Sequence, residues 1–186
     1  DRRVGLRYCS RTAPEPRYQV IAILSSVGGP IRNELIQLLR HSNPITRSAA
    51  VEILCRLDGM TGTNVTMLVR MLDDPAEQVQ IQSAYHLADT KTHHEQASNA
   101  LRDCLTSAAS ENLRTQLIRC LGKLSASVPD NAAIFEESLA DPSANVRKVA
   151  VTCLSVLAQT DGRLFDHLVP MLADSDTSVV RETVRC

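Results

Sequence analysis

The sequence predicts an all-α protein, a right-handed α-solenoid built from tandem pairs of short helices. Three observations predict this fold. A block of apolar and turn residues recurs about every 33 residues, and apolar side chains within each block are spaced by threes and fours. Aromatic residues are scarce, at 3% with no Trp. The core must therefore be built from Leu, Val, Ile and Ala, which let helices approach closely.

The repeat is clearest over residues 139–157, LADPSANVRKVAVTCLSVL. Similar stretches lie 67 and 100 residues earlier, and the copy between them has one extra residue in its turn. One anchor position in these copies is occupied by Arg47, Gln80, Arg114 and Arg147, at intervals of 33, 34 and 33 residues. We therefore expect one solenoid unit over residues 1–186. Its repeats would be about 1–29 (incomplete), 30–62, 63–94, 95–129, 130–162 and 163–186 (incomplete).

Each repeat is expected to contain two helices. A short apolar run such as 164–172 forms the first, and a longer run such as 146–157 forms the second. Asp and Pro at 141–142 separate them, because Asp caps a helix N-terminus and Pro is tolerated only in the first turn. Gly-containing turns, such as Asp-Gly at 58–59 and 161–162, separate one pair from the next. Turn chemistry and periodicity therefore agree.

The sequence resembles the HEAT-repeat pattern, in which the first helix ends in L-x-D and the second opens with V-R-x-x-A. Residues 139–157 and 168–184 (LVPMLADSDTSVVRETV) carry this resemblance. The period near 33 is shorter than in typical HEAT repeats and is similar to that of compact HEAT-like repeats, which also occur in phycobilisome-lyase-type proteins. The resemblance extends over about five and a half copies. The resemblance specifies the solenoid fold strongly and the function only weakly.

The resemblance also implies a structural role for the anchor arginines. In HEAT families the turn Asp and the Arg six residues later usually bond across neighbouring repeats as a ladder. Position 41 is His and the fourth copy lacks a turn Asp, so we expect an incomplete ladder. The chain has 17 Arg and 3 Lys, which favours multi-donor structural bonds over a phosphate-binding basic stripe. The ladder residues would be Arg47, Asp74, Arg114, Asp141, Arg147 and Asp174.

No metal or cofactor site is predicted, although one position of the second helix holds Ile53, His86, Cys120 and Cys153. Cys and His are zinc ligands, but they must converge to about 2.0–2.3 Å from the ion. Stacked helices lie about 8–10 Å apart. We therefore expect these side chains to be core residues, with His86 half-buried.

Enzymatic activity is not predicted either. HEAT-fold deoxyhypusine hydroxylases hold di-iron with His-Glu pairs from several repeats, whereas His94 and Glu95 form such a pair once, in a loop or first helical turn. HEAT-fold alkylpurine DNA glycosylases use a basic concave face with aromatic residues, which this chain does not resemble. There is no interpretable Ser-His-Asp set or Gly-rich phosphate loop. The glycosylation sequon at Asn64 opens an expected first helix, and we interpret it as a chance match.

The predicted function is a scaffold that binds a protein or peptide on the concave face, which the second helices line in HEAT-type stacks. Positions one, five and nine after each anchor point away from the core. Tyr and Arg are favoured at binding hot spots, so Tyr85 and Arg119 form the best candidate pair. The predicted partner-binding residues are Tyr18, Glu52, Arg56, Tyr85, Asp89, Arg119, Lys123, Lys148 and Thr152.

Two alternative functions stay open, a nucleic-acid scaffold and, less favoured, a HEAT-fold enzyme. The net charge of −1 and the pI near 6.6 do not favour nucleic acid. The locally basic start supports it, through Arg2, Arg3, Arg7, Arg11 and Arg17.

The expected location is the cytoplasm, with no membrane partner. The six cysteines form no CxxC or secreted-domain pattern, and no run of about 18 apolar residues exists. The chain starts at Asp1 and stops in an apparent helix, so we expect the remaining repeats of a longer parent chain as neighbours.

Overall fold

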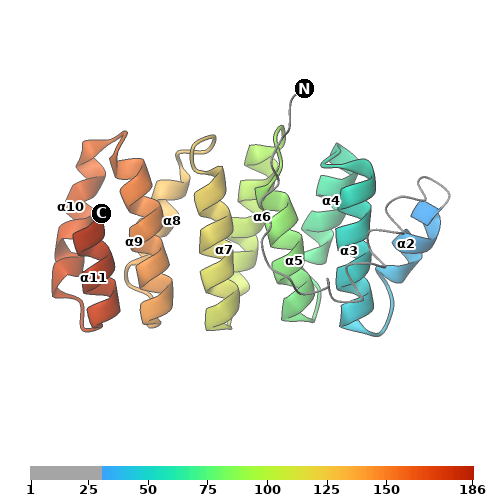
Figure 1. Ribbon diagram of the computed structural model, residues 1–186, viewed down its shortest axis with the longest axis horizontal. Coiled ribbons are helices and arrows are strands. Elements are labelled where there is room, and N and C mark those ends of the chain that lie inside the picture. Colours follow the sequence, from blue (N-terminus) through green and yellow to red (C-terminus); the bar gives the residue numbers. More distant parts are fainter. Residues whose placement is uncertain (1–30) are drawn as a thin grey trace, which may run out of the picture.

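The computed structural model describes residues 31–186, which form a row of paired helices (Figure 1). Within the row α2 pairs with α3, α4 with α5, α6 with α7, and α8 with α9. The predicted all-α solenoid is confirmed. Tyr18 and the basic start lie outside the described residues. The helices are α2 (Arg32–Leu38), α3 (Pro44–Asp58), α4 (Gly62–Met71), α5 (Glu77–Ala88), α6 (His94–Ser107), α7 (Glu111–Leu124), α8 (Asn131–Ser138), α9 (Ala144–Ala158), α10 (Phe165–Leu168) and α11 (Thr177–Arg185).

Polar residues begin most of the second helices. A side-chain oxygen at the cap accepts a backbone N–H from the first turn, which satisfies one of the four donors that a helix start leaves unpaired. In α3 the cap is followed by Pro44, which needs no such partner. The capping residues are Asn43 for α3, Ser110 for α7, Ser143 for α9 and Asp176 for α11.

The helices form two layers. The second helices α3, α5, α7, α9 and α11 pack on one another in chain order, whereas the first helices contact their counterparts in neighbouring repeats far less. The second-helix layer is therefore the more closely spaced. Aliphatic side chains fill the space between the layers, including the fully buried Leu68, Leu87, Leu121 and Leu154. None of the helices in residues 31–186 combines the length and apolar character needed to cross a membrane.

The expected first helix over 164–172 is interrupted. The segment is divided into a 3-10 turn η2 (Gly162–Leu164), the four-residue α10 and a second 3-10 turn η3 (Val169–Ala173). Pro170 lies in η3 and has no N–H to donate, and its ring would clash with the carbonyl four residues earlier. The chain therefore tightens into 3-10 turns at this point, and the segment still packs on α9 and α11.

Candidate protein-binding groove

Ion pairs that are largely shielded from water join the turns of neighbouring repeats. Arg147 Nε donates to Asp174 Oδ2 at 2.7 Å and Nη2 to Oδ1 at 2.8 Å, a bidentate pair. Its third nitrogen, Nη1, donates to the Asp141 carbonyl at 2.9 Å in the turn of its own repeat. One guanidinium thus ties the turn of one repeat to the turn of the next.

The ladder is more complete than the sequence suggested. Arg47 forms the same bidentate pair with Asp74, at 2.6 and 2.7 Å, and Arg114 pairs with Asp141, at 2.8 and 3.0 Å. Each partner lies 27 residues further along the chain, in the next repeat. A comparison of Arg and Asp within one repeat therefore misses these pairs. Only Gln80, whose counterpart 27 residues later is Ser107, lacks this rung among residues 31–186.

His41 replaces the turn aspartate at the start of the described ladder. Its Nδ1 accepts the Asn43 backbone N–H at 3.0 Å. In the other turns the Oδ1 of Asp74, Asp141 or Asp174 accepts the N–H two residues later, at 2.8–2.9 Å. The imidazole thus takes the carboxylate's place in the turn.

The rungs favour the ionised form of two carboxyl groups. The hydrogen bond from Arg147 lowers the pKa of Asp174 below its ordinary value, against the effect of partial burial. For Asp74, burial raises the pKa, but the hydrogen bonds from Arg47 and from the Ala76 N–H outweigh it, and the pKa is lowered. The ladder therefore stabilises the charged form of these carboxyl groups, whereas desolvation alone would raise their pKa.

A groove of about 580 Å³ lies on the second-helix surface. It is formed by α7, α9 and α11, with Tyr85 of α5 at one edge. Five of the predicted partner-binding residues line it: Tyr85, Arg119, Lys123, Lys148 and Thr152. Its other lining residues are Gly122, Val149, Cys153, Val156 and Glu182.

Two cations in the groove have no protein partner among residues 31–186. Lys123 pairs with Asp89 at 3.1 Å and lies 5.7 Å from the centre of the Tyr85 ring. The side chains of Arg119 and Lys148 form no hydrogen bond or ion pair with the described residues, and both also line an adjoining hollow of about 460 Å³. The free positive charge is therefore concentrated where the two hollows meet.

The remaining groove residues are held by neighbours. The Tyr85 hydroxyl donates to Gln116 at 2.6 Å, and the Thr152 hydroxyl donates to Glu182 at 3.2 Å. Val156 is 59% exposed and presents an apolar surface at one end. The groove thus combines fixed polar edges, an apolar patch and two available cations.

Three predicted residues lie away from this groove. Glu52 and Arg56 form an ion pair with each other at 2.8 Å on α3, and Asp89 is used by Lys123. Val156 is the ninth residue after the anchor Arg147, a position that corresponds to Arg56 and Lys123, but it is not among the predicted partner-binding residues. Glu182 is not at any of the positions selected from the sequence, and the packing of α11 on α9 brings it to the groove.

The floor of the groove depends on a close approach of α7 to α9. An added Cβ at Gly122 would lie 2.6 Å from Cys153 Sγ, closer than real contacts allow. Cys153 Sγ donates to the Ile118 carbonyl at 3.7 Å. Burial raises the pKa of this thiol to about 11, despite the opposing effect of Arg119. Cys153 is therefore protonated at neutral pH and serves as packing rather than as a nucleophile.

The other polar candidates occupy structural positions. Burial lowers the pKa of the half-buried His86, and its ring contacts the Gln82 amide at 3.1 Å. His93 precedes α6 and His94 is the first residue of that helix. No group of three or more His, Cys, Asp or Glu suited to a metal ion occurs within residues 31–186.

The sequon asparagine is part of the core. Asn64 is 1% exposed, and its amide donates to the carbonyls of Leu54 at 3.3 Å and Gly59 at 2.8 Å. Gly59 has a φ of 65°, in the left-handed region, and turns the chain from α3 toward α4. The Asn64 side chain is thus buried in the folded protein.

Comparison with known families decides the classification. A family model described as HEAT repeats matches residues 32–122, 64–155 and 98–185. This chain belongs to the HEAT-repeat family. The three matches start 32 and 34 residues apart, which agrees with the repeat period. HEAT repeats generally mediate protein interactions as scaffolds, and their solenoids are typically non-catalytic.

A solved structure supports the same fold. The crystal structure of YibA from Escherichia coli matches with a TM-score of 0.61 and 19% sequence identity. The match covers 96% of this chain and 64% of the YibA chain. At this identity the likeness concerns the fold alone. No curated protein matches the chain.

Proposed function

We propose that this HEAT-repeat protein is an interaction scaffold that binds a protein or peptide segment on the concave face formed by its second helices. The closer-spaced layer of a curved stack lies on its concave side, and here that layer is the one of the second helices. The observation that supports the proposal is the groove itself. Arg119 and Lys148 both line it, and neither side chain has an ion-pair partner among the described residues.

The groove favours a segment with both acidic and apolar side chains. A carboxylate placed between Arg119 and Lys148 would gain charge-assisted bonds, which are stronger than bonds between neutral groups. An apolar side chain next to it would contact Val149 and Val156. Tyr85 adds an aromatic edge of the kind often found at binding hot spots. Its hydrogen bond to Gln116 holds the ring in place, which lowers the entropic cost of binding.

The test is quantitative affinity capture with the wild-type chain and with Tyr85→Ala/Arg119→Ala. We expect proteins captured by the wild type to lose about tenfold or more in recovery, because each truncation at a hot spot costs at least about 1 kcal/mol. The matched control is Phe165→Ala/Arg181→Ala. It removes an aromatic residue of similar exposure, 41% against 37% for Tyr85, and an exposed Arg outside the groove. Equal recovery by the groove variant and the control would contradict the proposal.

The nucleic-acid alternative makes a different prediction. Binding through phosphates weakens steeply as salt rises, because counterions are released on association. Retention on a nucleic-acid column that falls with salt, and that Arg119→Ala reduces, would favour this alternative. Its main sequence support, the basic start, lies outside the described residues.

A further inference from the structure

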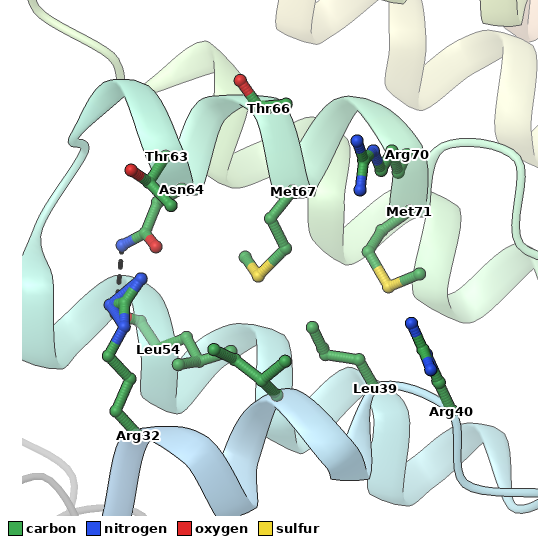
Figure 2. Close-up of a pocket in the computed structure, with 11 residues that line it drawn as sticks. Arg32, Leu39, Arg40, Leu54, Thr63, Asn64, Thr66, Met67, Arg70 and Met71 are labelled. Atoms are coloured by element: carbon green, nitrogen blue, oxygen red, sulfur yellow. Dashed lines mark hydrogen bonds between the residues drawn. The ribbon is translucent and has the colours of Figure 1, made fainter.

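A second hollow lies on the opposite layer, between the first helices α2 and α4 (Figure 2). Its volume is about 540 Å³, within the range of ligand-binding pockets. Leu39 and Leu54 are buried at its base, and Ile36, Met67 and Met71 form its sides. Thr63 and Thr66 of α4 are also among its lining residues.

The pocket exists because α2 and α4 are spread apart. First helices contact each other little along this solenoid, and α2 has only seven residues. Ile36 is consequently 42% exposed, and Met67 and Met71 are half-buried. Met side chains are flexible and polarisable, so they adapt to the shape of an incoming apolar group. The surface is thus suited to receive side chains from outside.

Positive charge stands at both ends of the pocket. Figure 2 shows Arg40 and Arg70 together at one end and Arg32 at the other. The lining contains no carboxylate. Arg32 pairs with Asp58, whereas no residue in 31–186 pairs with Arg40 or Arg70. Arg32 is the first residue of α2, and Arg40 lies two residues beyond its end at Leu38.

We propose that this pocket binds an acidic amphipathic helix of a protein partner. Apolar side chains one turn apart would enter between Ile36, Met67 and Met71. A carboxylate near one end of that helix would meet Arg40 and Arg70, which have no ion-pair partner among the described residues. This is the helix-in-groove mode of recognition, with charge complementarity setting the direction of the helix.

The preceding segment of this chain fits these observations less well as an occupant. Residues 1–30 of this chain carry five Arg against Asp1 and Glu15, so their charge has the same sign as the rim of the pocket. The pocket lies on the other layer from the proposed groove, so the two sites are independent.

The test starts from a phage-displayed library of random 16-residue peptides, panned on the immobilised chain. We expect enrichment of sequences in which Asp or Glu residues flank apolar residues at helical spacing. Enriched peptides, labelled with fluorescein, are then titrated by fluorescence anisotropy against wild type and Arg40→Glu/Arg70→Glu. Affinity should fall at least about tenfold, because reversing two charges replaces attraction by repulsion. Both arginines are exposed, so the fold should persist, and circular dichroism checks this.

Two control variants distinguish binding in the pocket from binding elsewhere on the solenoid. Arg181→Glu reverses an exposed Arg on α11 and should leave the affinity unchanged. Arg119→Glu/Lys148→Glu reverses the groove on the second-helix layer and should also leave it unchanged. Peptides that lose affinity only on this last variant would overturn the pocket proposal while supporting the groove.

Three further outcomes would also overturn the pocket proposal. One is enrichment of peptides without acidic residues. Another is an equal loss of affinity in all the charge-reversal variants, which would indicate non-specific charge attraction. The third is Arg40- and Arg70-dependent binding of decanoate without any enriched peptide, which would assign the pocket to small amphipathic acids.

Discussion

Two junctions between neighbouring repeats differ in how they are held. The junction of α7 and α9 has the partly buried rung between Arg114 and Asp141. The junction of α5 and α7 has Gln80 and Ser107 at the matching positions and no rung. There the polar bonds lie on the second-helix surface. They are Tyr85 with Gln116, Lys123 with Asp89, and Asn112 with Glu77.

The length of α6 explains this difference. Asp74 follows the end of α4 at Met71 by three residues, and Asp141 follows the end of α8 at Ser138 by three. Ser107 is still the last residue of α6, so it does not lie in an equivalent turn. A rung requires an Arg on one repeat and an Asp in the turn of the next. Where the turn is changed, both partners are absent, and the junction relies on exposed contacts instead.

The largest expected effect comes from breaking a rung. Arg147→Ala should lower the free energy of unfolding by about 3 kcal/mol, because it leaves Asp174 shielded from water without its partner. Gln80→Ala is the matched control at the junction without a rung, and it should cost at most about 0.5 kcal/mol. Urea denaturation followed by circular dichroism measures both values. Similar losses in the two variants would show that the rung is not what distinguishes the junctions.

Packing at the α7–α9 junction should be nearly as sensitive. Gly122→Ala should lower the free energy of unfolding by about 2 kcal/mol, because the new Cβ would overlap Cys153 Sγ and force the helices apart. Gly162→Ala is the control, since a Cβ at that position meets nothing within 4 Å. Thermal unfolding of the two variants compares them. An unchanged melting temperature for Gly122→Ala would mean that α9 can move away from α7 without a loss of stability.

The rungs should also make stability depend on acid. Because the folded-state pKa of Asp174 lies below its ordinary value of 3.8, its contribution is complete above that pH and is lost as the pH falls through the lowered pKa. Asp174→Asn should therefore cost about 1.5 kcal/mol at pH 6 and progressively less toward pH 2. The control is Asp89→Asn, which removes the exposed ion pair with Lys123 and should change the free energy of unfolding little at either pH. Urea denaturation at several pH values measures the loss of stability in Asp174→Asn. A loss that does not change with pH would contradict the prediction.

The smallest effect should come from adding the missing rung. In Gln80→Arg/Ser107→Asp the coupling energy should stay below about 1 kcal/mol, because residue 107 is helical and an Asp there opposes the helix dipole. The same double-mutant cycle on Arg114 and Asp141 should give a larger value. Equal couplings would mean that side-chain identity alone, and not the turn, determines where rungs form.

Sequence reasoning worked best for features governed by neighbouring residues. Apolar spacing and the Asp-Pro turn at 141–142 act within one or two helical turns, so periodicity and turn chemistry revealed the helix pairs. The N-cap of α9 is Ser143, however, and not Asp141 as the turn chemistry suggested. Projection of the second helix also selected five residues that line the groove. It did not anticipate the interruption at η3, although Pro170 was a readable signal.

The sequence by itself determined the repeat, the helix pairs and the residues that face away from the core, because these follow from local backbone geometry and burial. Only the tertiary structure decided which Arg meets which Asp, since partners 27 residues apart are joined by stacking of repeats. It also decided that Lys123 forms an ion pair with Asp89, whereas the side chains of Arg119 and Lys148 have no partner among the described residues. The spread of α2 from α4 likewise depends on packing between helices, which no single helix encodes.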